Sequence, residues 1–275
     1  MKKIILFLIF GAFLFSSNAV VGGDMPETPL FYRINIDKEI GATTWRYMQK
    51  GYDEARKAGA AAIILRLNTY GGTVVHADSI RTLILNSSMP VYAFIDNNAA
   101  SAGALIAISC DSIYMREGAN IGAATVVNQT GKAMPDKYQS YMRATIRSTA
   151  EAQGYDTVYT VSGDTEVHWR RNPQIAEAMV DERIVVPGLC DSTKVLTLTA
   201  REALQWGYCE AIAESVDDII TSRIGYWQYK VEQFEPSFYD DLVGFLQKPV
   251  VQGILIMLII GGIYFEIQTP GVGFP

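Results

Sequence analysis

Short apolar runs alternate with amphipathic stretches along the first half of the chain. Four runs are rich in β-branched and aromatic residues and have the length of strands: 30–36, 62–67, 90–95 and 112–115. Three segments between them have the composition and spacing of helices: 42–58, 74–85 and 101–109. This regular alternation predicts an α/β fold with a mainly parallel sheet.

The pattern weakens after a Gly/Ala-rich loop at 118–124. A long helix is expected over 135–153, and residues 155–193 show little periodicity. Thr199 and Ser215 each precede a short helical stretch, and both residue types are favoured helix N-caps. We expect the folded domain to cover 30–221, followed by a linker over 222–248.

The N-terminal end has the pattern of a secretory signal peptide. Lys2 and Lys3 precede an uncharged apolar run, and small residues at Ser17 and Ala19 fit a cleavage site. We therefore expect a signal peptide over 1–19, the alternative being an uncleaved membrane anchor. In either case the domain that follows is expected to be exported.

The C-terminal end carries a second apolar segment. No charged side chain occurs over 249–265, which reaches the lower limit for a bilayer span of about 17 residues. We expect a transmembrane helix over 249–267, the alternative being a buried core helix. Residues 268–275 are expected to be the tail of a truncated product or of a fragment.

Composition excludes several classes of function. Charged residues make up 19% of the chain, the net charge is −6 and no Lys/Arg-rich stretch stands out, so nucleic acid is not an expected partner. The two histidines and three well-separated cysteines do not form a metal-binding pattern, and neither common phosphate-loop motif occurs, so no cofactor is expected. Cys190 and Cys209 are candidates for one disulfide, beside the alternative that these two and Cys110 are free buried thiols.

Ser101 is the first candidate for chemistry. It lies between a predicted buried strand and a helix that opens with small residues. A hydroxyl at this end of a helix meets free N–H groups and a dipole that stabilise developing negative charge. The arrangement has the logic of a nucleophile elbow without the usual G-x-S-x-G sequence. The alternative is an ordinary serine N-cap.

Gly71 and Gly72 are the second candidate. They follow an earlier strand and directly precede a helix. A glycine pair in that place can turn its backbone N–H groups outward as oxyanion donors, although a tight turn has the same sequence. Because parallel strands end at the same edge of a sheet, this pair and Ser101 are expected to converge.

Three segments in this order and spacing carry a family resemblance: Thr69-Tyr70-Gly71-Gly72, Ala100-Ser101-Ala102-Gly103 and Gly118-Ala119-Asn120-Ile121-Gly122-Ala123. Over roughly 30–220 the chain resembles the NfeD family of membrane-bound, ClpP-class serine proteases and, more distantly, signal peptide peptidase A. The resemblance implies a ClpP/crotonase-like spiral of βαβ units. It also implies that Ser101 is the nucleophile and that the oxyanion donors are the N–H groups of Gly71 or Gly72 and of Ala102.

The resemblance further implies a Ser–Lys dyad, with the lysine near the helix expected over 135–153. A lysine acts as a base only where burial lowers its pKa. One alignment with the family places the base at Lys137, which is our expectation, and Lys132 is a looser candidate. Another alignment places it at Arg147, which cannot serve as a base.

Histidine bases are weaker alternatives. His76 lies on the helix after the glycine pair, and His168 lies in a polar stretch. The preferred interpretation is an exported, membrane-tethered serine endopeptidase that acts on peptide or protein substrates. By resemblance, a stomatin-like membrane protein is its substrate or partner, and a homo-oligomer is implied.

Two other functions remain open. One is an inactive scaffold that binds stomatin-like partners, suggested by Arg147 at one family base position. The other is a crotonase-type acyl-CoA enzyme, which the signal peptide argues against because CoA thioesters are cytosolic.

Overall fold

A twisted, mostly parallel sheet organises the protein. The computed structural model describes residues 28–159 and 165–268, so the expected signal peptide at 1–19 lies outside them, as does the tail after residue 268. The strand order is β10-β1-β2-β3-β4-β9, and β5 connects β3 to β8. The sheet comprises β1 (Leu30–Ile36), β2 (Ala62–Thr69), β3 (Val91–Ala100), β4 (Ser112–Met115), β5 (Asn120–Gly122), β8 (Thr197–Thr199), β9 (Ala211–Ile212) and β10 (Lys230–Gln233).

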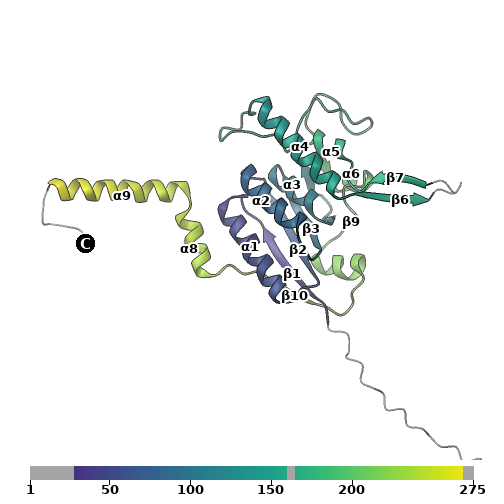
Figure 1. The fold of residues 1–275 in the computed structure, drawn as a ribbon, viewed down its shortest axis with the longest axis horizontal. Helices are drawn as coiled ribbons and strands as arrows, with labels where there is room; N and C mark the ends of the chain where they lie inside the picture. Colours follow the sequence, from purple (N-terminus) through teal and green to yellow (C-terminus); the bar gives the residue numbers. More distant parts are fainter. Residues whose placement is uncertain (1–27, 160–164, 269–275) are drawn as a thin grey trace, which may run out of the picture.

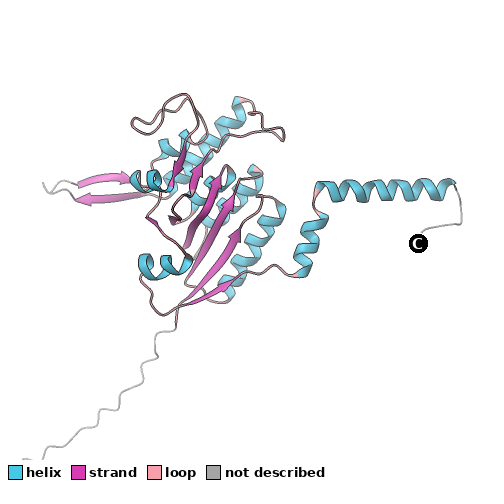
Figure 2. Ribbon diagram, turned by 180° about the vertical axis from the view of Figure 1, so that it is seen from behind, coloured by secondary structure: helices cyan, strands magenta, loops and turns pink. Residues whose placement is uncertain are grey.

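Helices lie over one face of this sheet (Figure 1). They are α1 (Ala42–Lys57), α2 (Val74–Leu85), α3 (Ala102–Ser109) and α4 (Asp136–Ala152), with the short α5 (Pro173–Ala178) and α6 (Ala200–Gln205) beside them. Among the described helices, α7 (Val216–Asp218) and the π-helix η1 (Ile219–Ile224) lie on the opposite face, as the view from behind shows (Figure 2). A hairpin of β6 (Tyr155–Tyr159) and β7 (Thr165–Trp169) projects from the domain.

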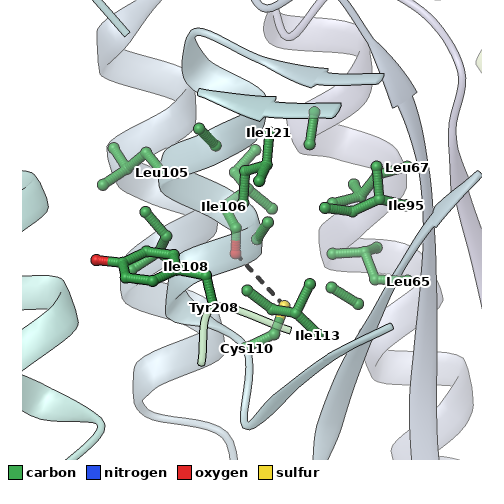
Figure 3. Close-up of a cluster of buried hydrophobic side chains, with 14 of the residues drawn as sticks. Leu65, Leu67, Ile95, Leu105, Ile106, Ile108, Cys110, Ile113, Ile121 and Tyr208 are labelled. Carbon is green, nitrogen blue, oxygen red and sulfur yellow. Dashed lines mark hydrogen bonds between the residues drawn. The ribbon is translucent and has the colours of Figure 1, made fainter. Parts of the chain in front are cut away.

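The core is centred on α3, because every residue of this helix is buried. Its apolar side chains pack between the other helices and the sheet, where Ile106 lies close to strand residues such as Ile121 (Figure 3). In water, a helix that is apolar all round is stable only when it is buried inside the protein. Each such isoleucine or leucine contributes about 1.5–3 kcal/mol through burial. Ser101, the residue directly before α3, is therefore held at the end of a fully buried helix.

The α/β class and the order of the first seven elements are as predicted. The third strand is longer than the expected 90–95, because its polar end continues to Ala100 and pairs with β5. Thr199 and Ser215 cap helices through their side chains, as expected. All three cysteines are free and buried, and burial raises the pKa of the Cys209 thiol to about 12.

The stretch 222–248 differs from the linker that the sequence suggested. It adds β10 to the edge of the sheet, paired in parallel with β1, and then forms the helix α8 (Phe238–Leu246). β10 was missed because Lys230 and Glu232 give it a polar face, which is typical of an edge strand.

The final helix, α9 (Pro249–Gln268), agrees with the expected span at 249–267. Its mean hydropathy of 2.1 over an 18-residue window and its length of 20 residues suffice to cross a bilayer. It extends away from the domain without burying its side chains (Figure 1).

Candidate active site

The backbone at Ser101 is strained. Its φ of 56° and ψ of −120° lie in a region that residues other than glycine seldom adopt. Such a conformation costs about 1–3 kcal/mol and persists only where the surroundings enforce it. Here β5 enforces it, because Ala100 pairs with Gly122 and the Ser101 N–H donates to the Gly122 carbonyl at 2.8 Å. The half-buried hydroxyl is thereby presented at the sharp turn from β3 into α3.

Gly71 lies directly against Ser101. A Cβ added at Gly71 would come within 2.6 Å of the Ser101 Cβ and 3.0 Å of its Oγ. The Gly71 φ of 109° is also a conformation that residues other than glycine adopt only with strain. The turn after β2 and the turn after β3 therefore touch, as the sequence predicted.

Backbone hydrogen bonds distinguish the two glycines. The Gly71 N–H donates to Thr69 Oγ1 at 3.1 Å and is therefore already engaged. Ile40 bonds to both sides of Gly72: its N–H donates to the Gly71 carbonyl and its carbonyl accepts from the Thr73 N–H. In this parallel bridge Gly72 turns its own N–H away from Ile40. Within 28–159 and 165–268 that N–H has no hydrogen-bond partner.

A small pocket of about 50 Å³, lined mainly by residues with apolar side chains, adjoins the serine. The first turn of α3, the start of α2, one side of α4 and the strand-like segment after β5 form its wall. The lining residues are Gly72, Val74, Ala77, Ser101, Ala102, Ala124, Thr125, Val126, Val127 and Met142. Such a pocket admits a small apolar group next to the hydroxyl.

Gln139 of α4 fixes one wall of this pocket. Its side-chain oxygen accepts from the Val126 N–H at 3.0 Å, and its amide nitrogen donates to the Val126 carbonyl at 2.7 Å. Met142, one turn further along α4, faces the pocket itself. The segment after β5 and α4 are therefore held together as one side of the site.

Comparison with known proteins decides the family. A family model described as the N-terminal domain of NfeD1b matches residues 30–169, just over half of the chain. The chain belongs to the NfeD1b family. The match spans the three segments that suggested an NfeD protein, so that interpretation is confirmed.

Two curated relatives extend the similarity over nearly the whole chain. The membrane protein NfeD1b of Bacillus subtilis is 31% identical over 268 residues, which cover 97% of this chain and 57% of the relative. The membrane-bound protease PH1510 of Pyrococcus horikoshii is 27% identical over 298 residues, covering 100% of this chain and 60% of the relative. The chain thus spans about three fifths of the length of these two proteins.

Solved structures of the 1510-N membrane-bound stomatin-specific protease have a similar fold. A lysine-to-alanine mutant in complex with a substrate peptide gives a TM-score of 0.64 at 26% identity, covering 80% of this chain and 98% of that one. A serine-to-alanine mutant gives 0.61 at 26% identity, covering 76% and 99%. The α/β fold class predicted for this NfeD1b-family chain is confirmed, and its fold is similar to that of the 1510-N protease.

The two candidate lysines of this NfeD1b-family chain lie outside the pocket lining. Lys137 is exposed in the first turn of α4, and its Nζ lies 4.9 Å from the centre of the Tyr138 ring. Lys132 is exposed in the preceding loop, where its backbone N–H donates to Asn128 Oδ1 at 3.0 Å. Neither ammonium lines the Ser101 pocket.

The other base candidates point elsewhere. Arg147 forms a surface ion pair with Glu177 at 2.9 Å. His76 Nδ1 is 2.6 Å from Thr73 Oγ1, and this histidine does not line the pocket. His168 belongs to the β6–β7 hairpin, opposite Asp156. Among the residues that the structure describes, no cluster of side chains could hold a metal ion.

Asp181 is a residue that the sequence analysis missed. It is 8% exposed and contacts Arg143 of α4, while Arg183 donates to it with its Nε at 2.9 Å. Hydrogen bonds from Arg183 hold the pKa of Asp181 well below its usual range. Arg183 also bonds to Asp136 at 2.8 Å, so the start of α4 is tied to the segment after α5. In sequence, Asp181-Glu182-Arg183 looks like an ordinary solvated turn.

Proposed function

We propose that this chain is a serine endopeptidase whose nucleophile is Ser101. The observation that carries the proposal is the strained serine held against the glycine turn, beside a small pocket lined mainly by residues with apolar side chains. Strain of this kind at a sharp strand-to-helix turn is typical of a side chain presented for reaction. A plain N-cap role fits poorly, because the Ser101 side chain accepts no capping hydrogen bond.

In the proposed reaction Ser101 Oγ attacks the carbonyl carbon of a peptide bond. The oxyanion that forms accepts hydrogen bonds from backbone N–H groups of Gly72 and Ala102, both of which line the pocket. Of the glycine pair, Gly72 is the better donor because the Gly71 N–H is engaged with Thr69. Expulsion of the amine leaves an acyl-serine, which water hydrolyses. Loss of one such donor lowers the rate by about 10²–10³-fold in a well-studied serine protease.

Lys137 is proposed as the general base that takes the serine proton and returns it to the leaving amine. A lysine base must be neutral, which requires that its surroundings exclude water. Lys137 is exposed in the isolated chain. The proposal therefore requires that bound substrate or a second copy of the chain covers α4, which fits the expected homo-oligomer.

Apolar segments of membrane-associated proteins are the proposed substrates. Exposed apolar side chains occur at the pocket and close to it in sequence. Val127 lines the pocket, Val75 and Tyr141 are next to lining residues, and Tyr138 lies about one helical turn before Met142. The 1510-N protease is described as stomatin-specific, and one of its structures holds a substrate peptide. We propose a stomatin-like protein as substrate or partner here, with the protease domain on the exported side of the membrane.

One observation favours a second function, a scaffold that binds such partners without cleaving them. In the 1510-N structures the substituted lysine lies 41 residues after the substituted serine. Counting the same number from Ser101 leads to Met142, which faces the pocket, and not to Lys137. If Met142 stands in the place of the base, the serine has no proton acceptor.

A serine-directed fluorophosphonate probe separates the two functions. The full chain and its Ser101→Ala, Lys137→Ala, Lys132→Ala and Met142→Lys variants would be labelled from about pH 6 to about pH 10, spanning the onset of lysine deprotonation. The protease proposal expects labelling that rises with pH and is lost with Ser101→Ala and Lys137→Ala but kept with Lys132→Ala. The scaffold expects no labelling of the wild type and a gain in Met142→Lys.

A further inference from the structure

The helix α8 joins the catalytic domain to the apolar helix α9. It ends at Leu246, and only Gln247 and Lys248 separate it from Pro249, the first residue of α9. Figures 1 and 2 show α8 beside the domain and a bend of the chain before α9. The position of α8 relative to a membrane is therefore set by α9 on one side and by the domain on the other.

Polar contacts hold one face of α8 on α1. The Asp240 carboxylate is 2% exposed, accepts from Arg46 Nε at 3.0 Å and pairs with Lys50. Tyr47 donates its hydroxyl to Asp241 at 2.9 Å. One turn after Asp240, Gly244 lies against α1, where an added Cβ would be 3.0 Å from Thr43 Cγ2. These contacts fix which way the remaining faces of α8 point.

The opposite face of α8 is apolar and open. Five large side chains occupy a continuous arc of the helix surface, each between 41% and 76% exposed: Phe238, Tyr239, Leu242, Phe245 and Leu246. The spacing of Phe238, Leu242 and Phe245 places them on one stripe of a helix. An exposed stripe of this kind marks an interaction surface.

We propose that this stripe lies in the lipid–water interface, with α8 parallel to the membrane surface. The two-residue connection between α8 and Pro249 spans at most about 10 Å, so the end of α8 cannot leave the bilayer surface once α9 crosses the membrane. Aromatic residues are favoured at that depth. An amphipathic helix with such a face buries it at the boundary of headgroups and acyl chains.

The partner is the apolar part of the interface and not anionic headgroups. The described segment Phe238–Leu246 contains no Lys or Arg, and its two aspartates are engaged with α1. Recognition of an anionic surface takes a cluster of about four to eight basic residues beside a membrane span, whereas the connection from α8 to α9 carries the single Lys248. Membrane contact of α8 is therefore expected to be independent of anionic lipid.

Contact of α8 with the membrane surface also brings the candidate site near the membrane. Lys38 and Glu39 line a cavity of about 440 Å³ together with Phe245 of α8 and Pro249 of α9. The next residue, Ile40, forms the bridge to Gly72 that shapes the turn against Ser101. This consequence rests on the proposed protease function: a substrate segment would reach Ser101 from the membrane surface, whereas lipid contact of α8 does not depend on catalysis.

Depth-dependent quenching tests the proposal on the full chain in phosphatidylcholine vesicles. Leu242→Cys, Phe245→Cys and Leu246→Cys would each carry an environment-sensitive fluorophore, with spin-labelled lipids as quenchers. Ser140→Cys, on an exposed position of α4, is the matched control, and the wild type controls for its three buried cysteines. Thermal melting checks that each variant is folded.

The expected result is strong quenching at the α8 positions by a spin label near the headgroups, and several-fold weaker quenching at Ser140. The quenching should not change when anionic lipid is added. Quenching at α8 no greater than at Ser140 would overturn the proposal. So would a protected fluorophore that lipid does not quench but that transfers energy to a second labelled copy, because the stripe would then be a protein interface. Failure of Ser101 to react with a fluorophosphonate would leave these outcomes unaltered.

Discussion

Replacing Gly71 by alanine should disable Ser101 while leaving the fold intact. The new Cβ would lie 2.6 Å from the Ser101 Cβ and 3.0 Å from Oγ, distances at which one of the two turns must shift. Ser101 cannot yield easily, because its N–H is bonded to Gly122 and α3 is buried on all sides. A displacement of about 1 Å at a reacting group can cost about 10²-fold in rate. We therefore expect fluorophosphonate labelling of Gly71→Ala to fall at least to that extent.

The loss of stability in Gly71→Ala should be modest, and a control variant can reproduce it. Gly71 has a φ of 109°, and forcing a non-glycine residue into a left-handed conformation costs about 1–2 kcal/mol. Gly59→Ala, at the end of α1, is the control: its φ is 67° and an added Cβ would meet nothing within 4 Å. Each variant should lose about 2–8 °C in Tm, given the size of the domain.

The assay combines labelling rate with thermal melting for both variants. Gly59→Ala should be labelled at the wild-type rate despite its lower Tm, whereas Gly71→Ala should fold but react slowly. If both variants react like the wild type, contact between the glycine turn and Ser101 does not control reactivity, and the reasoning fails.

Three further predictions concern ion pairs of the domain. Asp181→Asn should destabilise the fold by about 1.5–3 kcal/mol, because it weakens charge-assisted hydrogen bonds from Arg183 and the ion pair with Arg143. The arginines depress the folded-state pKa of Asp181, so the stabilisation by its carboxylate is fully present above the unfolded-state pKa of about 3.9. That stabilisation is lost as the pH falls from there through the lower folded-state pKa. In an acid titration followed by circular dichroism, the variant should therefore lose less stability than the wild type. Glu210→Gln should lower Tm by several degrees, because Arg171, which is 1% exposed, loses the carboxylate that lies 3.2 Å from its guanidinium. An unchanged Tm would show that Gln153 is a sufficient partner for the buried Arg171. Arg147→Ala should leave labelling and Tm nearly unchanged, because its ion pairs are half-exposed, and a loss of labelling would return this position to the site.

The sequence predicted the parts of the fold that depend on local patterns. β1 and α2 have the expected bounds, because their apolar spacing and flanking polar residues leave few alternatives. The meeting of Ser101 with the glycine turn was also predictable, since both follow neighbouring parallel strands. The choice between Gly71 and Gly72 was not, because it depends on the hydroxyl of Thr69 and on the bridge from Ile40.

Features set by contacts between distant segments were not predictable. β10 pairs with β1 across most of the chain length, and nothing in the short polar sequence of β10 indicates that partner. The buried Asp181 gains its role from Arg143 on another element. The location of Lys137 was predictable only in part. The sequence placed it near the start of α4, but did not indicate that it lies outside the pocket lining.

The most direct test of the central claim is to identify the residue that reacts. The full chain in vesicles would be treated with a fluorophosphonate and digested, and the modified peptide located by mass spectrometry. The account predicts a single adduct on the Ser101 hydroxyl, absent from the Ser101→Ala variant. A chain that is folded yet unmodified at Ser101, or modified at another serine, would contradict it.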